Sequence, residues 1–191
     1  MEVEKQHLKQ KILFSALEIV PFDGWYNDII ESACKRIHLP IQYADIFFPD
    51  GTVELVKFFC SYVDDLMLEE VLKTNVNITK IHEKIILAIK IRFDILSKHK
   101  TSITKMISYL SLPWNVLNGA TIFWDTADII WSYVVGDSST DFNYYTKRAV
   151  LSIIYRATLL YWISDDSKSH HKTLAFLTRK IKKHRRVKKQ K

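Results

Sequence analysis

The scarcity of chain-breaking residues is the feature that most restricts how this chain can fold. Only 4 glycines and 4 prolines occur among 191 residues, whereas a fold built on many tight β-turns needs more of both. Apolar residues recur at intervals of three and four, as in Leu13, Leu17 and Val20, which places them on one helical face. No segment alternates apolar and polar residues over a useful length, so the sequence predicts an all-α bundle of about nine helices. The expected helices span about 8–20, 25–37, 42–47, 52–72, 79–97, 101–110, 113–135, 140–163 and 169 onward.

The positive charge is concentrated near the end of the chain. The formal net charge is +7, yet residues 179–191 contain nine Lys or Arg residues and no acid. The remaining 19 basic and 21 acidic residues leave the rest of the chain nearly neutral. The basic residues therefore predict a tail that binds an anionic partner, either a membrane surface or RNA, or that is simply solvated.

Targeting and membrane-spanning segments are not expected. The acids Glu2 and Glu4 precede the first apolar residues, unlike a secretory signal or a mitochondrial presequence. No run of 18 uncharged apolar residues occurs, so we expect no membrane span. Cys34 and Cys60 have neither metal-binding nor redox spacing, which indicates buried, reduced thiols.

The first four expected helices have the layout of TetR-type regulators. Residues 41–55 correspond to the recognition helix and the turn after it. Such a helix reads DNA with Arg, Lys, Asn and Gln, but Gln42 to Phe47 contains no cation, and Asp45 would repel phosphate. Only Lys35 and Arg36 remain, on the preceding helix. We expect a degenerate helix-turn-helix that is kept for packing, and DNA is an unfavoured partner.

Segments 113–135 and 140–163 are apolar around most of their circumference. Such helices either pair with a second copy of the chain or line an apolar cavity, and the two explanations are compatible. Asp125 and Asp128 interrupt the first segment on a common face, and Arg156 interrupts the second. We expect these charges to form an ion pair between the helices.

The connection between these segments contains more than a helix turn requires. Gly136 is expected to end the first helix, Ser139 or Thr140 to cap the second, and Asp141 to suit its positive end. Two adjacent tyrosines and two cations then follow without a structural explanation: Tyr144, Tyr145, Lys147 and Arg148.

Catalytic and metal-binding motifs are not found in the sequence. It contains no Gly-rich phosphate loop, nucleophile elbow or cysteine nucleophile motif. The adjacent His170 and His171 point to different sides of a helix, and Glu4 to His7 is the only Glu-x-x-His spacing. We therefore expect a protein that is not an enzyme and has no metal or cofactor.

Several motifs resemble one family. Leu112-Pro113-Trp114-Asn115, the segment from Asp128 to Trp131, the run from Gly136 to Ala149, and then Tyr155 and Thr158 resemble the coenzyme Q (ubiquinone) biosynthesis accessory proteins of the COQ-nine family. Pro21-Phe22-Asp23-Gly24-Trp25 and Phe48-Pro49-Asp50-Gly51 look like that family's bacterial members. The resemblance covers residues 10–182.

The resemblance implies a TetR-like fold that has lost DNA binding. It implies a homodimeric, non-catalytic protein that binds isoprenoid quinone intermediates at the membrane and presents them to the di-iron demethoxyubiquinone hydroxylase. The implied location is the bacterial cytoplasm, on the inner face of the inner membrane, or the matrix side in mitochondria. The alternative is a TetR-type transcriptional regulator that binds DNA and a hydrophobic ligand.

The implied regions are a helix-turn-helix-like region (1–72), a lipid-binding and dimerisation region (73–182) in the same compact unit, and the basic tail (183–191). The expected lipid contacts are Phe123, Trp124, Ala127, Trp131, Ile154 and Leu160. The expected contacts with the hydroxylase are Tyr144, Tyr145, Lys147 and Arg148. The expected membrane-surface residues are Lys182, Lys183, Arg185, Arg186, Lys188 and Lys189.

Two residues differ from the family's usual pattern. Tyr144 stands where relatives usually have Trp, and Trp114 replaces a usual His. Tyrosine keeps an aromatic anchor with a polar end, so an interface at this position is still expected. The mitochondrial members also have a long amphipathic membrane helix that this sequence lacks, so membrane contact is expected to depend on the basic tail.

Overall fold

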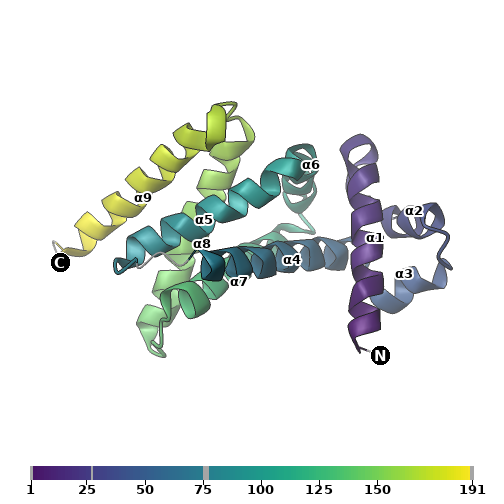
Figure 1. Ribbon diagram of the computed structural model, residues 1–191, viewed down its shortest axis with the longest axis horizontal. Helices are drawn as coiled ribbons and strands as arrows, with labels where there is room; N and C mark the ends of the chain where they lie inside the picture. Colours follow the sequence, from purple (N-terminus) through teal and green to yellow (C-terminus); the bar gives the residue numbers. More distant parts are fainter. Residues whose placement is uncertain (1, 27, 75–77, 190–191) are drawn as a thin grey trace. The chain divides into compact units, whose positions relative to one another are not determined.

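The computed structural model describes residues 2–26, 28–74 and 78–189, and side chains within 3–26, 28–74 and 78–184. Within these residues the regular structure is helical and no strand occurs, which confirms the all-α prediction (Figure 1). The elements are α1 (Glu2–Asp23), α2 (Ile29–Arg36), α3 (Gln42–Phe47), α4 (Thr52–Lys73), α5 (Ile81–Leu96), η1 (Ser97–His99), α6 (Lys100–Leu110), α7 (Val116–Ile129), the π-helix η2 (Ile130–Val135), α8 (Phe142–Ile163), η3 (Lys168–His170) and α9 (His171–Lys189).

The helices form two compact units. Unit 1 contains Met1–Tyr62 and His99–Gly119, and unit 2 contains Val63–Lys98 and Ala120–Lys191. The two units are described separately below. These two units are defined by how the helices pack. The predicted regions 1–72, 73–182 and 183–191 were defined by function, and they remain a prediction.

In unit 1, α1 packs against α2 and α6. Ile12, Ala16 and Val20 are fully buried, and their spacing is the helical face that the sequence predicts. The helix predicted over about 8–20 is longer in the structure, because α1 continues through Pro21 to Asp23. The helix ends where Gly24 adopts a left-handed conformation (φ 88°) and donates its N–H to the carbonyl of Val20 at 2.9 Å. A glycine, not the proline, therefore sets the turn, since only glycine adopts this backbone angle without strain.

In unit 2, α9 packs against α5 and α8 (Figure 1). Helix α5 also packs against η2. A polar cluster lies inside this helical core. Arg92 forms an ion pair with Asp64 and donates its Nε–H to the Tyr155 hydroxyl at 2.7 Å. Thr126 donates to the other Asp64 oxygen at 3.0 Å. Burial raises the pKa of Asp64 to about 6, against the opposing effects of Arg92 and Thr126. The cluster satisfies charges that would otherwise be costly to bury.

Candidate functional site

The segment between α7 and α8 begins with an unexpected change of helix type. The predicted helix from 113 to 135 starts only at Val116, since Asn115 accepts the first helical bond from Gly119 (2.9 Å). It then becomes the π-helix η2 from Ile130. π-helical turns are rare and occur frequently at functional sites. This segment therefore marks the candidate site in unit 2.

Gly136 ends η2 as the sequence predicts. It adopts a left-handed conformation (φ 76°, ψ 41°), and the next residue, Asp137, donates its backbone N–H to the Trp131 carbonyl at 2.9 Å. The predicted caps Ser139 and Thr140 are wrong. Asp141 caps α8 instead, because its carboxylate accepts the backbone N–H of Asn143 at 2.9 Å.

A charged cluster holds this turn against the start of α8. Lys147 Nζ lies 2.6 Å from Asp137 Oδ1, and Arg148 Nη1 lies 3.3 Å from Asp137 Oδ2. Arg148 also forms an ion pair with Asp128 and donates to the Ser132 hydroxyl at 3.0 Å. Burial would raise the pKa of Asp137, but hydrogen bonds from Lys147, Ser139 and Arg148 lower it to about 2. The carboxylate is therefore ionised throughout the neutral range.

The ion pair expected between the two apolar helices exists, but its predicted cation is wrong. Asp128 pairs with Arg148, which is only 1% exposed, whereas Arg156 lies at the surface. A guanidinium buried between two carboxylates is costly to desolvate unless it is hydrogen-bonded, and here it donates to Asp128, Asp137, Ser132 and the Tyr144 carbonyl. Arg148 therefore does not form part of the surface. Its contacts instead hold neighbouring residues of the site in position.

Tyr144 is one of the residues that Arg148 supports. The guanidinium carbon lies 3.5 Å from the centre of the Tyr144 ring, and the Tyr144 hydroxyl donates to Asp128 Oδ1 at 3.1 Å. This hydrogen bond raises the pKa of Tyr144. The ring is thus fixed and half-buried, and it presents one edge to its neighbour Tyr145 at a centroid distance of 5.1 Å.

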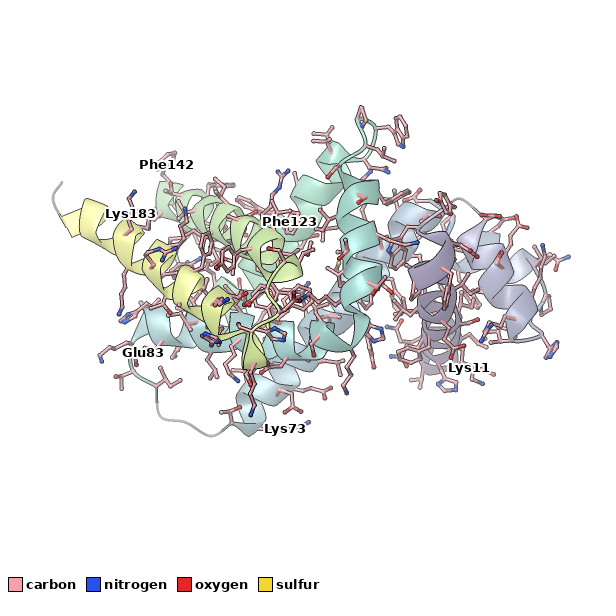
Figure 2. All side chains as sticks on the ribbon, turned by 90° about the horizontal axis from the view of Figure 1, so that it is seen from above. Lys11, Lys73, Glu83, Phe123, Phe142 and Lys183 are labelled. Atoms are coloured by element: carbon pink, nitrogen blue, oxygen red, sulfur yellow. The ribbon has the colours of Figure 1, made fainter. Side chains whose placement is uncertain are left out.

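Tyr145 and Phe142 form the exposed part of this surface. Their exposed fractions are 60% and 82%, and Trp124 on α7 lies beside Tyr145 at a centroid distance of 6.3 Å. Figure 2 labels Phe142, which is the first residue of α8. We call Phe142, Tyr144, Tyr145 and Trp124 the aromatic patch. Sequence reasoning did not include Phe142 in this surface, because the cap that places it at the start of α8 was predicted at Ser139 or Thr140 and not at Asp141.

An apolar pocket of about 310 Å³ opens beside the same cluster. Trp131 of η2 lines it, and this ring is fixed because its Nε1–H donates to the Lys147 carbonyl at 3.1 Å. Lys147 Nζ also lies 5.5 Å from the ring centre. The remaining lining residues come from α5, α8 and α9: Ile81, His82, Ile85, Lys147, Val150, Leu151, Ile154, Ile181 and His184.

The structure brings together only part of the predicted lipid site. Trp131 and Ile154 line the pocket. Phe123 and Ala127 are buried in the core of unit 2, and Leu160 is half-exposed (Figure 2 labels Phe123). Trp124 belongs to the aromatic patch. Sequence reasoning missed the contributions of α5 and α9, because nothing in the local pattern shows which distant helices close around η2.

The basic segment lies on α9. Lys182 and Lys183 are exposed, and Figure 2 labels Lys183. Arg179 and Lys180 lie 5.5 and 5.1 Å from the ring centre of Phe176. The remaining predicted membrane-surface side chains lie outside the described residues: Arg185, Arg186, Lys188 and Lys189.

The helix-turn-helix of unit 1 offers little positive charge. In α3, Gln42, Asp45 and Ile46 are exposed. On α2, Arg36 Nη2 lies 2.6 Å from Glu18, and Lys35 lies 3.7 Å from Glu31. The two cations that remain for phosphate contact are thus each paired with a carboxylate.

Among the described residues, no three His, Cys, Asp or Glu side chains gather in a way that could hold a metal ion. Within the same residues, each helix is too short or too polar to cross a bilayer.

Comparison with known proteins identifies relatives of this chain. The COQ9 family model matches residues 116–188. A mitochondrial ubiquinone biosynthesis protein COQ9 from Homo sapiens is 30% identical over 183 residues, which are 93% of this chain and 57% of that protein. Its counterpart from Bos taurus is 32% identical, over 93% of this chain and 57% of that protein. A probable COQ9 protein from Dictyostelium discoideum is 30% identical, over 91% and 58%. The chain thus spans somewhat more than half the length of these relatives.

A solved structure supports the fold. The crystal structure of a TetR transcriptional regulator from Nitrosomonas europaea matches with a TM-score of 0.70 and 20% identity, over 92% of this chain and 96% of that chain. The TetR-like helical fold is therefore confirmed, and at this identity the likeness concerns the fold alone. The COQ9 family model thus matches the α7-to-α9 segment that contains the candidate site, and the chain is similar to the COQ9 proteins over most of its own length.

Proposed function

We propose that this chain is a non-catalytic accessory protein of ubiquinone biosynthesis. It binds an isoprenoid quinone intermediate in the apolar pocket and presents it to the demethoxyubiquinone hydroxylase. The observation that carries the proposal is the pocket beside η2, which is lined by aliphatic side chains and Trp131 together with the polar residues His82, Lys147 and His184. The names of the relatives supply the pathway.

The pocket's chemistry suits part of a lipid. Its volume of about 310 Å³ is at the lower end for small-molecule sites, so it encloses a segment of a long chain and leaves the remainder outside. Each buried methylene contributes ~0.8 kcal/mol, so a few isoprene carbons suffice for measurable affinity. The polar lining residues His82 and His184 suit the oxygens of a quinone head.

The aromatic patch is the proposed docking surface for the hydroxylase. Exposed aromatic side chains often contribute most of the binding energy of an interface. Tyr145 and Phe142 supply the exposed area, and the fixed ring of Tyr144 supplies a rigid base. Lys147 lies at the rim of both features, whereas the buried Arg148 acts by positioning Tyr144.

Membrane contact is assigned to the basic residues of α9. Each Lys or Arg near an anionic bilayer contributes ~1 kcal/mol, and Lys182 and Lys183 are exposed. We propose that the protein thereby lies on a membrane surface, in bacteria or on the matrix side of mitochondria. Homodimer contacts are assigned to exposed apolar side chains near the C-terminal end of α8, such as Leu160 and Tyr161.

Lipid retention tests the pocket. Ile154→Trp fills it, and Ile153→Trp is the matched control, because Ile153 is exposed on the same helix. Native mass spectrometry and lipid extraction should find isoprenoid quinone intermediates on the parent chain and on Ile153→Trp, but not on Ile154→Trp. Equal lipid content in the two variants would exclude this pocket, and no quinone lipid on any of them would refute the function.

An electrophoretic mobility shift assay distinguishes the proposed function from the alternative, which is DNA-dependent transcriptional regulation. The TetR-like fold is compatible with DNA binding, whereas Asp45 on α3 and the paired cations of α2 argue against DNA binding. We expect no sequence-specific duplex binding by the full chain or by a chain without residues 179–191. Specific binding that survives this deletion would favour the regulator.

A further inference from the structure

Unit 1 contains a second pocket, which has no part in the proposed lipid function. It has a volume of about 530 Å³ and lies between the α1–α2 connection, α6 and the turn after α6. Half of the residues that line it are aromatic. The lining residues are Gly24, Trp25, Tyr26, Lys105, Ser108, Tyr109, Leu112 and Trp114.

The inner wall of this pocket is fixed. Trp25 is almost completely buried, its Nε1–H donates to the Ser102 carbonyl at 2.9 Å, and its ring packs against Phe59 at a centroid distance of 6.1 Å. The next residue, Tyr26, accepts a hydrogen bond at its carbonyl from the Thr52 hydroxyl at 2.5 Å. Hydrogen bonds to two different helices therefore hold the backbone and ring positions of this wall.

Gly24 permits the close approach of the Tyr26 ring. A Cβ atom at position 24 would lie 3.2 Å from Tyr26 Cε2, and the φ of 88° also disfavours any other residue there. The ring consequently rests on bare backbone. The sequence motif from Pro21 to Trp25 thus has a physical role, which is to build one wall of this pocket.

The polar groups of the pocket favour an anion. Among the described residues that line the pocket, Lys105 is the one charged side chain and none carries a carboxylate. Its Nζ donates to the Phe22 carbonyl at 2.7 Å, which orients the ammonium and leaves two of its three protons for a ligand. Burial raises the pKa of Tyr109, against an opposing hydrogen bond with Asn115, so this hydroxyl is a neutral donor at neutral pH.

The outer wall is a large exposed aromatic side chain. Trp114 is 73% exposed, and it follows α6 in the turn that precedes α7. A flat ligand ring that covers this exposed indole removes apolar surface from water, which stabilises the complex. The arrangement is thus a fixed inner wall, an open outer wall and one oriented cation.

We propose that this pocket binds a small aromatic anion, with its ring between the aromatic side chains and its carboxylate or sulfonate at Lys105. The charge of Lys105 selects against cationic rings. A neutral ring of the same size lacks the charge-assisted hydrogen bond and binds more weakly. The site is separate from the apolar pocket of unit 2, and the proposal does not depend on the lipid function.

Ligand-observed NMR and tryptophan fluorescence on the full chain test the site with naphthoate as the probe. Naphthalenemethanol and naphthylmethylammonium serve as the neutral and cationic probes of matched shape. We expect saturable naphthoate binding that is about tenfold tighter than that of the neutral probe, with no saturation by the cation. Equal affinity for the three probes would overturn the assignment of Lys105.

Variants locate the probe. Lys105→Met and Trp114→Ala should each weaken naphthoate binding about tenfold, and Lys105→Arg should retain it. Tyr133→Ala is the control, because Tyr133 lies in unit 2 with the same exposed fraction of 73%. Binding that is unchanged by Trp114→Ala refutes the site. If Trp114→Ala instead weakens binding to anionic lipid vesicles while naphthoate never saturates, the surface contacts membrane and the proposal is wrong.

Discussion

Replacement of Arg148 with methionine tests how the start of α8 is held. Methionine keeps the length and apolar character of the side chain but removes a guanidinium that is 1% exposed. Asp128 then loses its cation and keeps only the hydrogen bonds from Tyr144 and Ser132, while Asp137 keeps Lys147. Removal of one partner of a buried ion pair costs about 3–5 kcal/mol. Because the Asp128 side chain is 34% exposed and water can reach it, we expect the lower end, about 3 kcal/mol.

Thermal and urea unfolding, followed by circular dichroism, measure this effect. For a chain of this length, 1 kcal/mol shifts the melting temperature by ~2–4 °C, so Arg148→Met should lower it by ~6–12 °C. Lys147→Met is the control, because Lys147 is more exposed and forms its ion pair with a single carboxylate, Asp137, and it should cost about 1 kcal/mol. A loss for Arg148→Met no larger than that for Lys147→Met would refute the reasoning.

Three further variants test other parts of unit 2. Asp165→Ala removes the acceptor for both the N–H and the hydroxyl of Thr173 and should cost about 2 kcal/mol in urea unfolding, whereas Asp166→Ala at the surface should cost under about 0.5 kcal/mol. Gly136→Ala should cost about 1 kcal/mol through backbone strain alone, since a Cβ there meets no atom within 4 Å; a neutral result would contradict the left-handed turn. The folded-state pKa of Asp137 is lowered to about 2, so its stabilisation is present above pH ~4 and is lost as the pH falls toward 2. Asp137→Asn should remove up to about 1.4 kcal/mol per pH unit from the slope of stability in that window, and an unchanged slope would exclude the shift.

The helices were predictable because their signals are local. The spacing of Ile12, Ala16 and Val20 depends only on helix geometry, and these residues are buried as expected. Gly136 was also predictable, since few residues other than glycine adopt a left-handed conformation. The cap at Asp141 was missed because Ser, Thr and Asp are nearly equivalent at this position, so the choice depends on the turn geometry.

The candidate site was less predictable because it depends on contacts between distant segments. Local spacing placed Asp128 and Arg156 on facing helices, but only the fold decides that Arg148 is the buried partner. The π-helix that starts at Ile130 has no residue signature of its own. Ile81 and Ile181 meet in one pocket although the chain between them contains several helices.

Trp131 belongs to two features at once. It lines the apolar pocket, and its ring is held by Lys147 of the charged cluster, because the indole N–H donates to the Lys147 carbonyl and the Lys147 ammonium lies over the ring. A ligand that displaces this ring must also act on the first turns of α8, which carry Tyr144 and Tyr145. Ligand binding in the pocket and the conformation of the aromatic patch then depend on each other. Linkage makes their coupling reciprocal: if a bound lipid strengthens the docking of a partner by some factor, the docked partner strengthens lipid binding by the same factor.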